Sequence, residues 1–331
     1  MLAKSNPQHA ASQRIAILLS TFNGEDYLPA LLASLKNQER EFILVWRDDG
    51  SMDRSRELVR NAGLPHVVEC VHAEPGNNGG PVASFDLVTL KALQTDADYF
   101  LYCDQDDVWK PNKLTTMLSV ADGQSPSGPA LWHHDLRVVD AGLNEVHPSL
   151  WAYMKLEITS HQLSDLLSRN AVTGCACMVN RELLQFAAPI PHDVVMHDWW
   201  LALIASASGT ITAVPDALVD YRQHGSNTIG AKGFWHGLNP FTNWIQGWER
   251  GNAEYRSLFP QAHAAAQRCA ALGITDKVTS NTFAYFLSIP TASSAQKIKA
   301  LRHLGLRRGN LLLWVVAAIR VLNTPVDLPD L

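Results

Sequence analysis

The sequence has little that would suggest a secreted, membrane-spanning or zinc-stabilised protein. No stretch of its 331 residues reaches the roughly 18 uninterrupted apolar residues of a spanning helix, and the first thirteen lack the apolar core of a secretory signal. The five cysteines are odd in number, scattered and mostly in apolar segments, unlike a disulfide framework or a paired-cysteine zinc site. We therefore expect a cytoplasmic protein with reduced, buried thiols.

Acidic residues are missing from one long segment near the C-terminus. No Asp or Glu lies between Lys277 and Pro325, where seven basic residues occur: Lys277, Lys297, Lys299, Arg302, Arg307, Arg308 and Arg320. The chain has 27 basic and 32 acidic residues, so the remainder keeps 20 basic against 32 acidic, a formal charge of −12. The two regions therefore face different electrostatic partners, and the acidic remainder argues against nucleic acid as a ligand.

The segment 297–322 places basic residues beside an apolar stretch of about nine positions. This is too short to span a bilayer but suits a helix lying at a membrane interface, where anionic lipid would complement the basic charge. A core helix or a dimer-forming helix with solvated basic flanks is the alternative interpretation. We expect a polar tail at 1–13, a catalytic domain at 14–230 and a helical region at 231–331 that binds a membrane surface or supports a homo-oligomer.

The first hundred residues alternate between strand and helix patterns. Short apolar runs predict strands at 15–20, 42–46, 66–72 and 99–103. Helices are expected from Leu28, over 55–63, and in a segment whose apolar positions include Leu87, Leu90 and Leu93 at three-residue spacing, with Phe85 and Val88 beside them. Strands separated by helices favour a largely parallel sheet covered on both faces.

From about residue 130 the pattern changes to a mixed one. It predicts strands at 130–136, 171–179, 210–214 and 217–224, and helices at 160–170 and 198–207. These elements complete a mixed α/β domain near residue 230, and the remaining chain reads as helical.

Two clusters of acids directly follow predicted strands. Asp48 and Asp49 come after the second strand, and Asp104, Asp106 and Asp107 come after the fourth. The carboxyl ends of parallel strands share one edge of a sheet, which is where such sheets bind ligands. Carboxylates on a tight turn suit Mg²⁺ or Mn²⁺ bound together with a nucleoside diphosphate.

Helix capping is the alternative explanation for the second cluster. Asp106 or Asp107 could cap a helix starting near Lys110, with Pro111 in its first turn. One helix start needs only one cap, so capping does not explain three acids.

Six motifs in order carry a resemblance to a known family: TFNG (21–24), RDDGSMD (47–53), DQDDVWKPNKL (104–114), NAVTGC (170–175), HDWW (197–200) and YRQHGSN (221–227). The set resembles family 2 glycosyltransferases of the GT-A fold, in particular rhamnosyltransferase-like members that build cell-surface polysaccharides such as O-antigen. The resemblance covers roughly 14–230. It implies a nucleotide-diphospho-sugar transferase with a Rossmann-like mixed sheet and a helical C-terminal appendage.

The resemblance also implies roles on the donor side. Donor nucleotide binding falls to Thr21, Asn23, Asp48, Asp49 and Asp104, with Asp49 on the base imide, Asp48 nearby or structural, and Asp104 on the ribose or the water shell of the metal. Asp106 would bind the metal, His224 would complete the metal or diphosphate site, and Asp107 would be accessory or a cap. For His224 the plain alternative is an exposed or hydrogen-bonded histidine at a strand end.

On the acceptor side, Asp198 matches the position of the catalytic base in inverting members, where a carboxylate removes the proton of the acceptor hydroxyl. Its alternative role is the N-cap of the helix that follows. Familiar members have an acid before this Asp, whereas this sequence has His197. Gly174, Asp135, Trp199 and Arg222 are assigned to the donor sugar or the acceptor, with a plain strand-end role equally open for Asp135.

The resulting prediction is an inverting, metal-dependent hexosyltransferase at the inner face of the plasma membrane. Its donor is a nucleotide-diphosphate sugar, with dTDP-rhamnose the first choice, and its acceptor a growing polysaccharide or a lipid-linked glycan. A metal-dependent phosphohydrolase and a non-catalytic nucleotide-sugar-binding module are the alternatives. A binding module would not need an acid at position 198.

Overall fold

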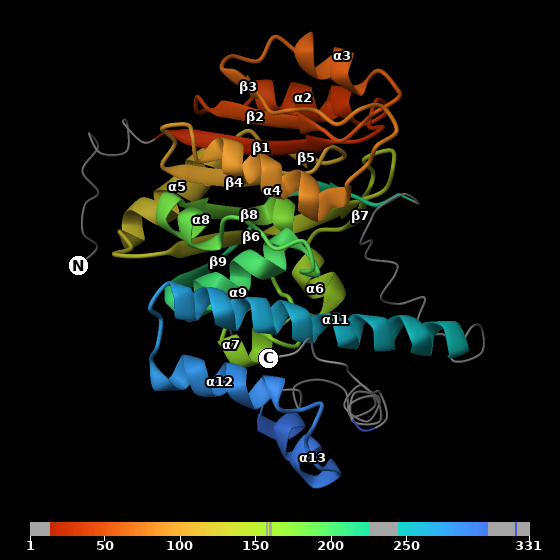
Figure 1. The fold of residues 1–331 in the computed structure, drawn as a ribbon. Coiled ribbons are helices and arrows are strands. Elements are labelled where there is room, and N and C mark those ends of the chain that lie inside the picture. Colours follow the sequence, from red (N-terminus) through yellow and green to blue (C-terminus); the bar gives the residue numbers. More distant parts are fainter. Residues whose placement is uncertain (1–13, 157, 159–160, 225–243, 304–321, 323–331) are drawn as a thin grey trace.

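The computed structural model describes residues 14–156, 158, 161–224, 244–303 and 322. Within these ranges a nine-stranded mixed sheet forms the centre of the molecule, in the order β3-β2-β1-β4-β8-β6-β9-β5, with β7 beside β6 (Figure 1). The strands are β1 (Ile15–Thr21), β2 (Ile43–Asp48), β3 (Val67–Glu69), β4 (Tyr99–Cys103), β5 (Val108–Trp109), β6 (Ala130–Val139), β7 (Glu145–His147), β8 (Cys177–Asn180) and β9 (Thr210–Arg222).

Helices cover both faces of this sheet because the central strands are apolar on both sides. In β1, Ala16 and Leu18 face one core, and Ile15, Ile17 and Leu19 face the other. The first core is closed by α4 (Gly80–Ala92), α7 (Leu163–Leu166), α8 (Arg181–Ala187) and α9 (His197–Ser208). The second is closed by α2 (Leu28–Lys36), α3 (Ser55–Arg60), α5 (Lys113–Gln124) and α6 (Leu150–Met154).

Strand direction brings distant parts of the chain to one edge. β3, β2, β1 and β4 are parallel, and Thr21 of β1 lies opposite Asp48 of β2. β8 is antiparallel to both β4 and β6, so β6 runs in the same direction as β4, and β9 is parallel to β6. The carboxyl ends of β1, β2, β4, β6 and β9 therefore meet at the same edge.

Three sequence-based predictions of elements were wrong. The helix expected at 160–170 is only the four-residue α7, and the strand expected at 171–179 is a 3-10 turn, η1 (Gly174–Ala176), followed by β8. The two strands expected at 210–224 are one strand, β9. Its register against β6 jumps from His134↔Val214 to Asp135↔Ala217, so a bulge absorbs the polar residues that suggested a turn.

The buried face of α4 is formed by Phe85, Val88 and Ala92, which have the spacing of one helix face. Of the three leucines counted in the sequence, Leu87 and Leu90 are 45% and 37% exposed, whereas Leu93, just after the helix, packs against the core.

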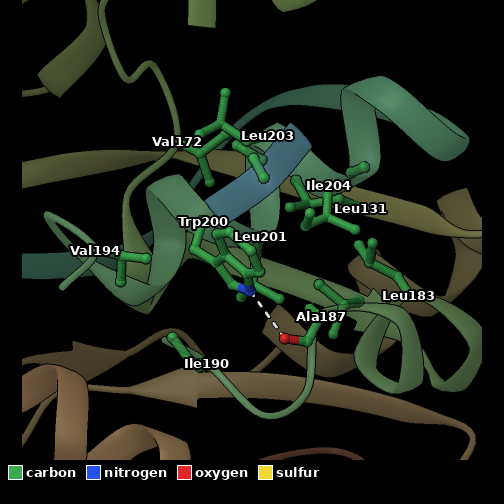
Figure 2. Packing of buried hydrophobic residues seen from close by; sticks show 14 of the residues in the cluster. Leu131, Val172, Leu183, Ala187, Ile190, Val194, Trp200, Leu201, Leu203 and Ile204 are labelled. Atoms are coloured by element: carbon green, nitrogen blue, oxygen red, sulfur yellow. Dashed lines mark hydrogen bonds between the residues drawn. The ribbon is translucent and has the colours of Figure 1, made fainter. Parts of the chain in front are cut away.

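Three helices follow the sheet: α11 (Trp244–Ala271), α12 (Lys277–Leu287) and α13 (Ser294–His303). The first two pack onto the first core, and Figure 1 shows α11 running beside α9. Phe259, Ala262 and Ala265 of α11 share the core of α9. Figure 2 shows the centre of this core, where the Trp200 indole donates to the carbonyl of Ala187 (2.9 Å).

Two polar side chains of α11 also join this helix to the segment between α8 and α9. Gln261 is buried and its Oε1 accepts from the backbone N–H of Val195 (2.9 Å), just before α9. Arg268 donates to the carbonyls of Ala188 and Pro189 (2.7 and 2.8 Å). The segment that leads into Asp198 is therefore held from α11.

The predicted interfacial segment 297–322 lies mostly outside the described residues, as does the tail 1–13. Among the helices that the structure describes, none combines the length and apolar character needed to cross a membrane.

Candidate active site at the carboxyl edge of the sheet

Asp48 ends β2, is fully buried and has its charge satisfied by the protein. Its Oδ2 accepts from the hydroxyls of Thr21 (2.9 Å) and Ser51 (2.6 Å), and its Oδ1 accepts from Nε of Arg56 (2.7 Å). Burial raises the pKa of Asp48, but the hydrogen bonds from Ser51 and Arg56 outweigh it, and the pKa lies below its ordinary value. This supports the structural role considered for Asp48.

Thr21 and Asn23 hold the loop that follows β1. The Thr21 hydroxyl, besides donating to Asp48, accepts from the Trp46 indole (3.0 Å). Asn23 has a positive φ of 46°, which its short polar side chain tolerates, and its Oδ1 accepts from the N–H of Met52 (2.9 Å). Their contact with a nucleotide stays a prediction, and their present hydrogen bonds shape the loop.

Asp49 is buried beside the start of α4. Its carboxylate pairs with the guanidinium of Arg47 and accepts from the N–H of Gly80 (3.0 Å). Arg47 is itself buried and donates to the Ser84 hydroxyl (2.8 Å). Arg47 therefore orients the acid that the sequence assigns to the nucleobase.

The turn after β4 is joined to the loop after β1 by Gln105. Its amide donates to the carbonyl of Phe22 (2.9 Å) and accepts from the N–H of Phe22 (2.8 Å). The middle residue of Asp104-Gln105-Asp106 thus fixes the acidic turn relative to the donor loop, a role absent from the sequence interpretation.

Asp106 meets His224 across this turn. Nε2 of His224 lies 2.8 Å from Oδ2 of Asp106, although the two residues are 118 positions apart. Arg222, at the end of β9, donates to the backbone carbonyls of Asp106 (2.8 Å) and Ala141 (2.9 Å), and its N–H donates to Asp107 (3.2 Å). The side chain of Arg222 thus binds the acidic turn.

Asp104 and Asp107 lie behind this pair, close to Cys175. One donor atom of each of these three residues lies within 4.8 Å of the others. Burial, together with the charges of Asp106 and Asp198, raises the pKa of Asp104 to about 7, and burial and Asp106 raise that of Asp107. The capping explanation was wrong for the acids, because α5 starts at Lys113 with Asn112 as its N-cap.

Lys113 is a fully buried lysine that the sequence interpretation missed. Its Nζ donates to the carbonyl of Cys175 (2.7 Å) and lies 3.3 Å from the centroid of the Trp109 ring. Burial lowers its pKa to about 8. The available signal was helical spacing, because Lys113 shares a face with the buried Met117 and Ala121.

Asp198 occupies the first turn of α9. It is the second helical residue, behind the N-cap Met196, so the alternative N-cap role was wrong. Its Oδ1 accepts from the side-chain amide of Asn170 (3.2 Å). Burial raises its pKa to about 7, partly offset by hydrogen bonds from the backbone of Trp199 and Gly174.

His197 and Gly174 pack against each other beside Asp198. The buried His197 ring packs on Phe85 and Tyr102, with centroids 4.2 and 4.8 Å away. Burial lowers its pKa to about 3, so the ring is neutral. A Cβ at Gly174 would lie 2.7 Å from Nε2 of His197, so glycine is required by this neighbour.

Asp135 and Trp199 are engaged within the protein. Asp135 accepts from the N–H groups of Leu136 (2.7 Å) and Trp151 (3.1 Å) and from the Ser149 hydroxyl, which fixes α6 to β6. The Trp199 indole donates to the carbonyl of Leu166 (2.6 Å). Their predicted contact with sugar stays a prediction.

The residues at this edge fit the divalent cation expected from the sequence. Asp106 and His224 present a carboxylate oxygen and an imidazole nitrogen to each other, and Asp104 lies close enough for its pKa to respond to Asp106. Carboxylate and imidazole donors are within the ligand preferences of Mn²⁺, and carboxylates also suit Mg²⁺.

Comparison with known proteins decides the family. The profile of the family described as "Glycosyl transferase family 2" matches residues 16–186, more than half of the chain. The chain belongs to this family. An uncharacterized protein of Mycobacterium tuberculosis H37Rv is 25% identical over 270 residues, covering 78% of this chain and 72% of that protein. The dTDP-rhamnosyl transferase RfbG of Shigella flexneri is 24% identical over 226 residues, covering 64% and 74%.

Solved structures confirm the predicted GT-A fold of this family 2 glycosyltransferase. Staphylococcus aureus TarS 1-349 in complex with UDP-GlcNAc superposes with a TM-score of 0.54 at 16% identity, covering 88% of this chain and 80% of that one. The mannosyltransferase PcManGT from Pyrobaculum calidifontis, in complex with GDP-Man and Mn²⁺, gives 0.50 at 14% identity, covering 95% and 88%.

Proposed function

We propose that this glycosyltransferase is an inverting, metal-dependent enzyme that moves a hexose from a nucleoside diphosphate to a hydroxyl of a glycan acceptor. One observation carries the proposal. Asp198, at the start of α9, lies close enough to the acidic turn for its charge to help raise the pKa of Asp104. Side chains that can bind a metal ion and a carboxylate whose pKa suits a general base therefore lie in one site.

On the donor side, Asp106 and His224 would hold Mn²⁺ or Mg²⁺, whose charge stabilises a departing diphosphate. Gln105 keeps these ligands beside the donor loop, and Arg47 presents Asp49 to the nucleobase. The solved relatives in complex with UDP-GlcNAc or with GDP-Man and Mn²⁺ support a nucleotide-sugar donor.

On the acceptor side, Asp198 takes the proton of the attacking hydroxyl. A base works best when its pKa is near the working pH, and burial raises the pKa of Asp198 to about 7. His197 and Gly174 hold its position by packing. The acceptor hydroxyl attacks the anomeric carbon of the donor sugar from the side away from the diphosphate. The diphosphate leaves with inversion at that carbon, and no covalent enzyme intermediate is required.

For the donor, similarity to the dTDP-rhamnosyl transferase RfbG favours dTDP-rhamnose. The acceptor in this proposal is a growing cell-surface polysaccharide or a lipid-linked glycan, with the enzyme at the inner face of the membrane. A phosphohydrolase would need no acceptor base, and a binding module would need no acid at 198.

Calorimetric titration tests the proposal. The purified chain is titrated with UDP, dTDP and GDP, each with and without Mn²⁺, and the series is repeated on Asp106→Ala. One nucleotide should bind in a metal-dependent way, and the metal effect should vanish in the variant. Asp276→Ala, an exposed acid at the start of α12, is the control and should bind like the wild type. Failure of every nucleotide to bind would overturn the proposal.

A further inference from the structure

The imidazole of His224 is held from two directions. Its Nε2 lies 2.8 Å from Oδ2 of Asp106, and its ring stacks on the phenol ring of Tyr27, with centroids 4.4 Å apart and planes inclined by 18°. The first contact points Nε2 at the acidic turn, and the second fixes the plane in which the ring lies. Both contacts are long-range, since Tyr27 belongs to the first loop and His224 to the end of the sheet.

Tyr27 is a rigid support because it begins α2. Its N–H donates to the carbonyl of Gly24 (3.0 Å), and its carbonyl accepts from Ala30 (3.1 Å). The guanidinium carbon of Arg222 lies 5.1 Å from the centroid of the same ring. One tyrosine thus contacts two side chains at the end of β9, those of Arg222 and His224.

Gln105 connects the segment that carries Tyr27 to the acidic turn. Its two hydrogen bonds to the backbone of Phe22 connect the segment that carries Tyr27 to the residue that precedes Asp106. The relative positions of Asp106 and His224 are therefore set by the loop after β1, although neither residue belongs to it.

We propose that Tyr27 is a positioning residue for His224, holding the imidazole in the orientation that a divalent cation requires before the cation arrives. The inference rests on the metal site of the proposed function. Without the ring, the imidazole gains rotational freedom that binding must remove, so affinity falls. An aromatic pair of this kind corresponds to a change of about 2- to 12-fold in a binding constant.

The test measures Mn²⁺ binding by electron paramagnetic resonance, in the absence of nucleotide, for wild type, Tyr27→Phe and Tyr27→Ala. Phenylalanine keeps the stacking ring and should bind Mn²⁺ like the wild type. Alanine should bind about 2- to 12-fold more weakly. Tyr153→Ala is a matched control, because Tyr153 also contacts a histidine ring, that of His147 at 5.5 Å, outside the site. It should leave Mn²⁺ affinity unchanged.

A second readout separates positioning from structural damage. Hydrogen exchange of the backbone amides in the loop after β1, measured in excess EDTA, should be similar for wild type and Tyr27→Ala, whereas general damage to that loop would speed it. If Tyr27→Ala does not fold, Tyr27→Leu removes the ring and keeps most of the volume. Equal Mn²⁺ affinity in wild type and the folded variant overturns the inference alone. Absence of Mn²⁺ binding in the wild type overturns the metal part of the proposed function, and this inference with it.

Discussion

Two sets of acids at the same edge of the sheet are treated in opposite ways by the protein. Asp48 and Asp49, after β2, are matched by Arg56 and Arg47 and by hydroxyl and backbone donors. Asp104 and Asp198 have raised pKa values instead, because burial, and for Asp104 also the charges of Asp106 and Asp198, is not fully compensated. Acid density alone therefore does not distinguish the two sets, whereas missing internal counter-charge does, and it marks the second set as the candidate catalytic one.

The largest expected effect tests the uncompensated set. Asp198→Asn removes the proposed base but keeps the size of the side chain, so transfer should fall by about 10²- to 10⁴-fold. Donor binding, measured by calorimetry, should stay the same because the acidic turn is intact. Transfer at the wild-type rate would show that another group accepts the proton.

A stability measurement tests the compensated set. Asp48→Asn leaves Arg56 without its buried partner, and the free energy of unfolding should fall by about 3–5 kcal/mol in urea. Asp106→Asn, which weakens only the hydrogen bond to His224, is the matched control and should cost no more than about 1.5 kcal/mol. Equal losses in both variants would contradict the distinction between the two sets.

The pH dependence of stability sharpens the comparison. The pKa of Asp198 rises from 3.8 to about 7 on folding, so between these values the native state holds a proton that the unfolded state has lost. Stability should therefore decrease as the pH rises from about 4 to about 7, by up to about 4 kcal/mol from this group.

Urea unfolding of wild type and Asp198→Asn at pH 5 and pH 8 measures this contribution, because the variant lacks the titrating group. The wild type should lose more stability than the variant between the two pH values. Parallel pH profiles would mean that the Asp198 carboxyl is compensated after all.

The smallest expected effect concerns Asp135, an acid assigned to the acceptor whose charge is compensated by hydrogen bonds. Asp135 is satisfied by Ser149 and two backbone N–H groups, so Asp135→Asn should cost about 1 kcal/mol in thermal unfolding. Nucleotide and Mn²⁺ affinities should be unchanged. A large loss of transfer with normal stability would instead place Asp135 in contact with the acceptor.

The sequence predicted those parts that are encoded locally. Strands such as 15–20 and 99–103 are short apolar runs followed by polar turns, so both the edge and the acids on it could be foreseen. The continuity of β9 could not, because a bulge against β6 keeps Pro215 and Asp216 inside a strand. Partners such as Gln105 with Phe22, or Tyr27 with His224, are invisible locally because they are far apart in the chain.

The attachment of α11 bears on how this protein can be divided. The family profile ends at residue 186, yet Phe259, Ala262 and Ala265 complete the core around α9, and Gln261 and Arg268 hold the approach to Asp198. A fragment shortened to the part matched by the family profile would expose that core to water and loosen the segment that carries Asp198. The portion that defines the family is thus smaller than the portion that must be made together for this chain to fold.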